Sequence, residues 1–187
     1  MKPQANYKVS QGWLTPARKR PSENTSQRPE GVDVSLIVIH GISLPPAEFG
    51  GDYIDQLFSN ALDPEEHPYF KEIYQLRVSS HLLIKRDGSI NQYVPFDQSA
   101  WHAGVSSYRG QAQCNDYSIG IELEGTDDIA YTEAQYESLN SAIEVIRSAF
   151  PTIGNNDIVG HCHIAPNRKT DPGESFEWAK IGRAELD

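Results

Sequence analysis

The residues best suited to chemistry stand together between Gly160 and Gly173. This stretch reads GHCHIAPNRKTDPG and holds two histidines, a cysteine, a lysine and an aspartate. Imidazole, thiolate and carboxylate groups are the side chains that bind zinc in proteins. The lysine is either an incidental surface residue or a cation placed to act on whatever the metal binds. The stretch predicts part of a metal site, if the rest of the chain supplies the missing partners.

A catalytic zinc site uses about three protein ligands and keeps an open position. His161 and Asp171 are separated by a proline-containing loop that is long enough to turn both side chains inward. His40 ends the apolar run of residues 35–39 and is the natural third ligand, although a histidine there could equally belong to the core. Spacing alone does not exclude three competing ligands: Cys162, His163 and His102.

Amide hydrolysis fits such a site, because bound zinc activates water and polarises a carbonyl. The reaction also needs a group that moves protons and a cation at the developing oxyanion. Glu122 suits the first role and Lys169 the second. Glu122 lies in the alternating segment 118–124, which predicts either an ordinary half-solvated strand or a carboxylate that projects into a cleft beside Gly120.

The elements that must position these residues can be predicted from hydrophobic patterning. Thr132 and Gln135 form a capping box at the start of a helix that reaches Phe150, and Asp87-Gly88 marks a hairpin turn. Strands are predicted at residues 35–40, 77–84, 90–95, 118–124 and 158–160, and further helices at 52–61 and 175–186. This mixture favours a single α/β domain with a central mixed β-sheet flanked by helices.

The first 33 residues differ from the body of the chain, residues 34–187. They are polar, contain four prolines and carry the basic triplet Arg18-Lys19-Arg20. We expect this segment to run over the surface without regular structure, packed loosely on the body and anchored by Trp13 and Leu14.

Composition narrows the classes of function. Lys and Arg number 16 and Asp and Glu 26, which gives a net charge of −10 and argues against nucleic-acid binding. Two cysteines are too few for a disulfide scaffold and fit a reducing compartment. The N-terminus lacks an apolar signal-peptide core, and no run approaches about 20 apolar residues, so we expect a cytoplasmic protein without membrane association. No protein partner is evident.

Six segments of the chain closely resemble the AmpD family, which are zinc-dependent 1,6-anhydro-N-acetylmuramyl-L-alanine amidases of bacterial cell-wall recycling. They are IVIHGISLPPAEFGG, HPYF, RVSSHLLIKRDGSINQYVPF, AWHAGVSSYRG, CNDYSIGIELEGTD and GHCHIAPNRKTDPG. The resemblance implies the amidase fold shared with peptidoglycan recognition proteins and makes residues 34–187 the catalytic domain. Carried over residue by residue, it places the zinc ligands at His40, His161 and Asp171, and the catalytic residues at Glu122 and Lys169. Cys162 and His163 then become non-ligands.

The implied substrate is an anhydromuropeptide, cut between the lactyl group of the anhydro sugar and L-alanine. Its stem peptide carries carboxylates, for which Arg77, Arg109 and Arg168 are candidate clamps. Trp101 could offer a flat face to the substrate or belong to the core, and His102 could donate a hydrogen bond to the substrate. The chain departs from the family pattern at Gly41, where an asparagine is usual, and at Gln111 and Gln113, where arginine is common. The resemblance also implies an indirect effect on β-lactamase induction in hosts with that circuit.

Three alternatives remain open to experiment. A non-catalytic peptidoglycan-binding module on the same fold would usually lose a zinc ligand, and all three are present here. An amidase of intact peptidoglycan would act outside the cytoplasm, which the missing signal peptide disfavours. A glycosidase that uses Glu122 and Glu124 is weaker still, because residues two apart on a strand point the same way, whereas that chemistry flanks a bond from two sides.

Overall fold

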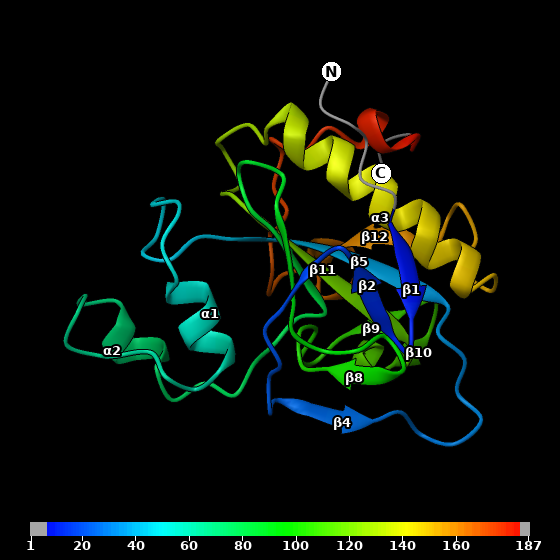
Figure 1. The fold of residues 1–187 in the computed structure, drawn as a ribbon, viewed down its shortest axis with the longest axis horizontal. Helices are drawn as coiled ribbons and strands as arrows, with labels where there is room; N and C mark the ends of the chain where they lie inside the picture. Colours follow the sequence, from blue (N-terminus) through cyan, green and yellow to red (C-terminus); the bar gives the residue numbers. More distant parts are fainter. Residues whose placement is uncertain (1–6, 184–187) are drawn as a thin grey trace.

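The computed structural model describes residues 7–183, and within them a six-stranded sheet has the order β12-β5-β11-β6-β7-β3 (Figure 1). Strands β12, β5, β11 and β6 run parallel, while β7 is antiparallel to β6. The bounds are β3 (Arg18–Lys19), β5 (Leu36–Ile42), β6 (Leu82–Ile84), β7 (Ile90–Gln92), β11 (Ser118–Glu124) and β12 (Ile158–Gly160). The predicted α/β class with a mixed central sheet is confirmed.

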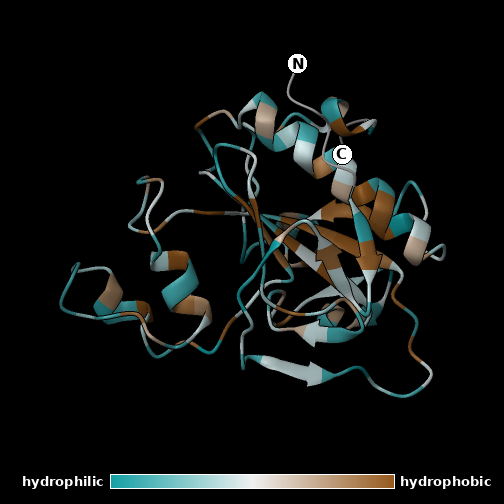
Figure 2. Cartoon of the chain, viewed as in Figure 1, coloured by the Kyte–Doolittle hydropathy of each residue, from teal (hydrophilic) through white to brown (hydrophobic). Residues whose placement is uncertain are grey.

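The two central strands, β5 and β11, are buried on both faces. All seven residues of β11 are buried, as are the first five of β5. Strands covered on both faces are usual where parallel strands form the middle of a sheet. The half-solvated reading of residues 118–124 is therefore wrong, and the polar side chains of this segment face the protein interior. Figure 2 shows hydrophobic residues gathered in the central strands of the sheet.

Helix α3 (Glu133–Ala149) covers one face of the sheet (Figure 1). Its predicted capping box is present: Thr132 accepts a hydrogen bond from the Gln135 backbone, and the Gln135 side chain accepts one from Thr132. The helix joins one core cluster with Ile37, Ile39 and the isoleucines of β11. These contacts fix which face of the sheet is left for the site.

A second group of elements lies to one side of the sheet (Figure 1). Helices α1 (Tyr53–Phe58) and α2 (Phe70–Ile73) share a separate core cluster with Leu83 and Tyr93. The helix predicted at 52–61 is thus present but shorter. The Asp87-Gly88 hairpin is confirmed by the pairing of β6 with β7. Its first strand is shorter than the predicted 77–84.

The final helix predicted at residues 175–186 is wrong for the part the structure describes, and residues 184–187 lie outside it. Only a 3-10 helix, η2 (Trp178–Ile181), forms there, followed by Gly182 in the left-handed region. Phe176 and Trp178 pack edge-on against each other, and Phe176 also packs against Tyr136 of α3. The apolar spacing that suggested a helix reflects this aromatic packing instead.

The expectation of an irregular N-terminal segment is also wrong for residues 7–33, and residues 1–6 lie outside the described part of the chain. Residues 7–33 contain β1 (Lys8–Ser10), β2 (Trp13–Thr15), β3 and β4 (Thr25–Gln27). Strand β3 forms an edge of the central sheet, and β4 pairs with β8 (Gln98–Ala100). The Gln92 side chain accepts a hydrogen bond from Leu14 N and donates one to Gly12 O, so body residues satisfy the backbone of the segment.

The remaining short elements are β9 (Ser107–Tyr108), β10 (Gln111–Ala112), η1 (Cys114–Asp116) and α4 (His161–Ile164). Over residues 7–183, none of the helices has the length and apolar character that crossing a bilayer requires.

Candidate active site

The site forms where three neighbouring parallel strands end. Strands β12, β5 and β11 run in the same direction, so their carboxyl ends meet at one edge of the sheet, where ligands bind in such folds. His40 near the end of β5 is the direct ladder partner of Glu122 on β11. His161 follows β12 immediately and begins α4. Side-chain alternation places His40 and Glu122 on the face opposite α3.

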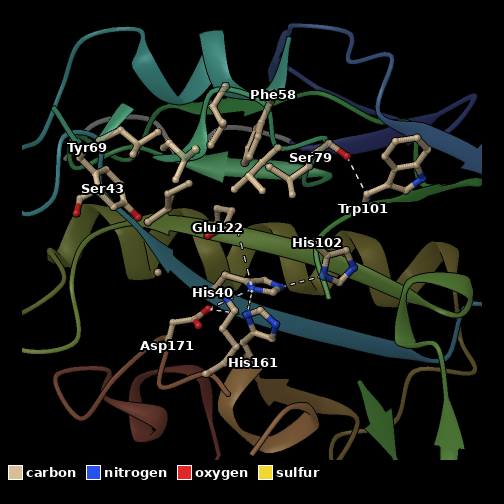
Figure 3. A pocket seen from close by; sticks show the side chains of 18 residues that line it. His40, Ser43, Phe58, Tyr69, Ser79, Trp101, His102, Glu122, His161 and Asp171 are labelled. Carbon is tan, nitrogen blue, oxygen red and sulfur yellow. Dashed lines mark hydrogen bonds and ion pairs between the residues drawn. The ribbon is translucent and has the colours of Figure 1, made fainter. Parts of the chain in front are cut away.

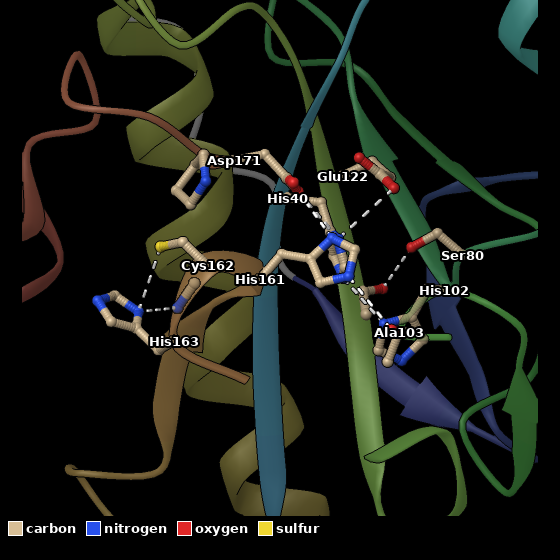
Figure 4. Close-up of polar contacts among 12 residues, drawn as sticks. His40, Ser80, His102, Ala103, Glu122, His161, Cys162, His163 and Asp171 are labelled. Atoms are coloured by element: carbon tan, nitrogen blue, oxygen red, sulfur yellow. Dashed lines mark hydrogen bonds and ion pairs between the residues drawn. The ribbon is translucent and has the colours of Figure 1, made fainter. Parts of the chain in front are cut away.

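Asp171 completes a triangle of ligand atoms with the two histidines (Figure 4). His40 Nδ1 lies 3.0 Å from His161 Nδ1 and 3.2 Å from Asp171 Oδ2, and His161 Nδ1 lies 3.1 Å from Asp171 Oδ2. Ligand bonds of about 2 Å in a tetrahedron give edges of about 3.3 Å. Among the described residues, these are the ones grouped closely enough to hold a metal ion. The arrangement fits a zinc ion without rearrangement.

The electrostatics of the triangle favour deprotonated ligands, which metal binding requires. Burial lowers the pKa of His40 to about 4, partly offset by the Asp171 carboxylate beside it. Burial alone would raise the pKa of Asp171. The contacts of its carboxylate with His161 and His40 have a larger, opposite effect, so the net pKa lies well below the usual range. The histidine is therefore neutral and the carboxylate ionised near pH 7.

Glu122 differs from its neighbour Glu124 in what its oxygens meet. Glu122 is buried, and within residues 7–183 its Oε2 has no hydrogen-bond partner. Burial, followed by the charge of Asp171, raises the pKa of Glu122 well above its usual value, while Lys169 acts in the opposite direction. Glu124 instead accepts hydrogen bonds from Gly50 N and from the Arg86 backbone. Glu122 is the carboxyl group left free to exchange protons.

A cavity of about 290 Å³ opens over this face (Figure 3). Its polar side is lined by the His40, His161 and Asp171 triangle with Glu122 and Lys169. Its opposite wall is apolar and comes from the region of α1 and α2, with Leu57, Phe58, Tyr69, Ile73 and Leu76. Apolar walls around a few polar groups are typical of small-ligand sites.

The family model for N-acetylmuramoyl-L-alanine amidase matches residues 30–174. The chain belongs to this amidase family. The match contains all five residues that form the polar side of the cavity. The predicted enzyme class, an N-acetylmuramoyl-L-alanine amidase, is confirmed by this match and by close relatives.

One such relative is the 1,6-anhydro-N-acetylmuramyl-L-alanine amidase AmpD of Citrobacter freundii, 58% identical over 92% of each chain. The crystal structure of a Se-Met AmpD derivative superposes with a TM-score of 0.91 at 57% identity, covering 93% of this chain and 97% of the other. A more distant structure is the Escherichia coli amidase AmiD in complex with anhydro-N-acetylmuramic acid-L-Ala-D-gamma-Glu-L-Lys. It has a TM-score of 0.58 and 25% identity, covering 94% of this chain and 64% of that one.

The predicted substrate-binding residues of the amidase fall into two groups. Trp101 and His102 line the cavity (Figure 3). Arg77 and Arg109 do not: Arg77 is exposed beside the cavity, and Arg109 pairs with Asp157 at 2.9 Å in the β9–β10 turn. Arg168 donates to the Ala103 and Val105 carbonyls. The geometry gives no support to a carboxylate clamp at Arg109.

The His102 ring lies between two polar groups of the protein. Its Nδ1 lies 2.8 Å from His40 Nε2, and its Nε2 lies 3.1 Å from Ser118 Oγ. Both ring nitrogens are engaged within the amidase, so neither is free to donate to a substrate. A Cβ at Gly120 would collide with the His102 ring, so this glycine makes room for the histidine rather than for Glu122.

Cys162 and His163 are not part of the triangle formed by His40, His161 and Asp171. His163 Nδ1 accepts a hydrogen bond of 2.8 Å from Gly160 N, which ties the ring to the start of α4. Cys162 Sγ lies 3.7 Å from the same nitrogen (Figure 4). Their backbone position still matters, because Cys162 N donates to the Asp171 carbonyl at 3.0 Å.

Sequence reasoning missed Tyr131. The position of this side chain accounts for the glycine at position 41. The Tyr131 hydroxyl donates to Pro172 O at 2.9 Å and so holds the segment that carries Asp171. A Cβ at position 41 would collide with this hydroxyl. The departure from the family pattern at Gly41 is thus matched to a tyrosine that no local motif marks as part of the site.

Proposed function

We propose that this amidase hydrolyses anhydromuropeptides between the lactyl group of 1,6-anhydro-N-acetylmuramic acid and L-alanine, as a step of peptidoglycan recycling. The observation that carries the proposal is the meeting of His40, His161, Asp171, Glu122 and Lys169 in one cavity. The specificity named for the 58% identical relative supports the choice of substrate. So does the anhydromuropeptide bound by the AmiD structure.

His40, His161 and Asp171 would hold a zinc ion through Nδ1, Nδ1 and Oδ2, since these atoms already stand at tetrahedral spacing. Zinc bound there would supply a Lewis acid that polarises the amide carbonyl and makes water a stronger acid. Two neutral imidazoles and one carboxylate leave a net positive charge on the filled site. That charge favours the carbonyl oxygen of the substrate over cationic groups.

Glu122 is proposed as the proton carrier. Its Oε2 is buried and has no hydrogen-bond partner within the described residues. Its raised pKa makes the carboxylate a stronger base toward the attacking water. It takes a proton from the attacking water and delivers it to the leaving nitrogen of L-alanine. This role requires a carboxyl oxygen without a structural hydrogen bond. Within residues 7–183, Glu122 Oε2 meets this requirement and Glu124 does not.

Lys169 is proposed to stabilise the oxyanion. It lines the cavity from the loop between α4 and Asp171 and is an exposed residue. A cation beside the developing negative charge stabilises the transition state more than the ground state and so lowers the barrier. Trp101 and the apolar wall would contact the sugar and peptide.

Mass spectrometry of the products from anhydromuropeptide and from ordinary muropeptide, with and without a chelator, tests the bond, the substrate class and the metal together. We expect release of peptides that begin with L-alanine from the anhydro substrate, and loss of that release with chelator. Asp171→Ala should abolish turnover and zinc retention, whereas Asp128→Ala, at an exposed aspartate, should change neither. Full activity of Asp171→Ala would contradict the ligand set, and digestion of intact sacculi would contradict the substrate.

We also propose a cytoplasmic location and an indirect effect on β-lactamase induction. Cys114 and Cys162, the two cysteines of the sequence, are both free within the described residues, which fits a reducing compartment. Deletion of the gene in a host with inducible β-lactamase should raise β-lactamase expression and accumulate anhydromuropeptides. Unchanged levels of both would contradict this proposal.

A further inference from the structure

A chain of hydrogen bonds connects the metal triangle to a backbone carbonyl outside the cavity. It runs from His40 Nε2 to His102 Nδ1 at 2.8 Å, and from His102 Nε2 to Ser118 Oγ at 3.1 Å. It ends where Ser118 Oγ donates to Cys114 O at 2.5 Å. His40 and His102 are both labelled in Figure 3, where a dashed line joins their rings.

The carbonyl end fixes the direction of every proton along this chain. A carbonyl only accepts, so the single hydroxyl proton of Ser118 points to Cys114 O. Ser118 Oγ must then accept from His102, which places a proton on His102 Nε2. In a neutral imidazole this leaves His102 Nδ1 as an acceptor, so the proton between the rings belongs to His40 Nε2. His40 Nδ1 is left with its lone pair, directed at His161 and Asp171.

The second histidine of the triangle reaches the same state by a shorter path. His161 Nε2 lies 3.3 Å from Ala103 O and 3.5 Å from Arg168 Nη2, which already donates to Ala103 O at 2.7 Å. The nearer carbonyl favours a proton on Nε2, which leaves the lone pair on Nδ1. Two imidazole lone pairs and one carboxylate oxygen therefore converge with no proton between them. Such a group of acceptors is stabilised by a cation.

The local structure is built to hold the chain in place. Ser118, Gly120 and Glu122 share one face of β11, and Gly120 leaves the space that the His102 ring fills. The backbone N–H groups of His102 and Ala103 both donate to Asn115 Oδ1, at 3.1 and 2.8 Å. The ring thus has little freedom to turn away from its two partners.

We propose that Ser118 and His102 are positioning residues that set the tautomer of His40, so that its Nδ1 lone pair is always available to the metal. The inference rests on the proposed zinc site and deepens it. Neither residue contacts substrate through this chain. Hydrogen bonds behind a metal-bound histidine orient the ring and raise its basicity, and their loss typically weakens metal binding about 10- to 100-fold.

Zinc affinity, measured by competition with a chromophoric chelator, tests the proposal without reference to turnover. Ser118→Ala removes the hydroxyl and should weaken zinc binding about 10- to 100-fold. Ser118→Thr keeps a hydroxyl and should restore most of the affinity. Ser99→Ala is the matched control: Ser99 is buried, and its hydroxyl has no partner within the described residues. Zinc affinity of Ser118→Ala equal to that of Ser99→Ala would overturn the proposal.

Nitrogen-15 NMR of the wild-type imidazoles supplies a test that does not depend on a variant folding. In the zinc-loaded protein we expect protons on Nε2 of both His40 and His102, and none on Nδ1 of either. A proton on His102 Nδ1 would overturn the proposal. Wild-type protein with the expected tautomers that leaves anhydromuropeptide uncut would refute the proposed function alone. Active wild-type enzyme with unchanged Ser118→Ala affinity would refute the tautomer proposal alone.

Discussion

The two faces of the β5–β11 strand pair make opposite use of the same backbone. On the face toward α3, the side chains are isoleucines and leucine, packed in one core cluster. On the other face, Ser118, Gly120 and Glu122 follow one another at alternate positions of β11, and His40 stands opposite Glu122. Both faces are buried. The first holds the sheet against its helix, and the second holds groups that we propose to be catalytic or metal-binding.

Because the two faces of β5 and β11 carry different side chains, the proposed catalytic groups are correctly placed only in this strand register. Side chains alternate with a period of two, so a one-residue slip would exchange the two sets completely. The apolar face resists such a slip, because it would bury Ser118 and Glu122 against α3. The core face therefore fixes the positions of the catalytic face, although it contributes no reacting group. Substitutions on the two faces should separate stability from activity.

The largest effect is expected at Glu122. Glu122→Gln keeps the shape of the side chain but removes the proton carrier, so kcat should fall about 10²- to 10⁴-fold. Zinc content and melting temperature should stay near wild type. Glu124→Gln on the same face is the control, since its carboxylate holds Gly50 and Arg86 and its loss should reduce stability more than kcat. Equal loss of kcat in both variants would contradict the distinction between them.

Ile121 probes the opposite face of the same strand. It is fully buried in the cluster with α3, and Ile121→Ala should lower the free energy of unfolding by about 2 to 5 kcal/mol. Urea denaturation measures this loss. Activity per folded molecule should remain close to wild type at low temperature. A large fall in kcat without a fall in stability would show that the two faces are not separable.

The buried His81 should make stability depend on pH. Burial, with the charge of Arg28, lowers the pKa of His81 to about 3, against 6.5 in the unfolded chain. Its stabilising contribution is present above pH 6.5 and is lost as pH falls toward 3, because the unfolded chain then binds the extra proton. Between pH 6 and 5, unfolding of the wild-type protein should take up as much as one proton more than unfolding of His81→Gln. The free energy of unfolding should therefore change less steeply with pH in the variant. Identical slopes in the two proteins would contradict this.

The smallest effect is expected at the cap of α3. Thr132→Ala removes the acceptor for Gln135 N and should cost about 1 kcal/mol of stability. Thermal unfolding monitored by circular dichroism measures the change, with Thr126→Ala as a comparison outside the helix. Steady-state kinetics should be unaffected, since Thr132 caps α3, which covers the face of the sheet opposite the cavity. A change in kcat would indicate that the position of α3 is sensed by the site.

Sequence could predict the parts of the fold that carry strong local signals. The capping box at Thr132, the Asp-Gly hairpin and the apolar run of β5 each follow from patterns of a few residues. The grouping of His40, His161 and Asp171 could be anticipated because the two histidines stand at strand ends and Asp171 follows in a loop. The resemblance to AmpD proteins then reduced the competing candidates, which spacing alone had left open.

The remainder depends on contacts between distant segments that no local pattern encodes. Ser118 looked like one polar residue of an alternating strand, yet its hydroxyl bridges His102 and the Cys114 carbonyl. No local pattern marks Tyr131, yet its hydroxyl donates to Pro172 O beside Asp171. In the N-terminal segment, the short polar strands β3 and β4 gain their backbone partners from β7 and β8. Such roles appear only when the fold brings the partners together.

Arg28 makes the N-terminal segment important for any truncated form of this enzyme. Its guanidinium donates to the carbonyls of Asn115, Asp116 and Ser118, the residues that bracket the start of β11. An expression boundary at residue 34, which composition suggests, would remove this clamp along with the edge strand β3. The shortest active version of the enzyme should therefore retain Arg28, and its minimal gene is longer than its catalytic motifs.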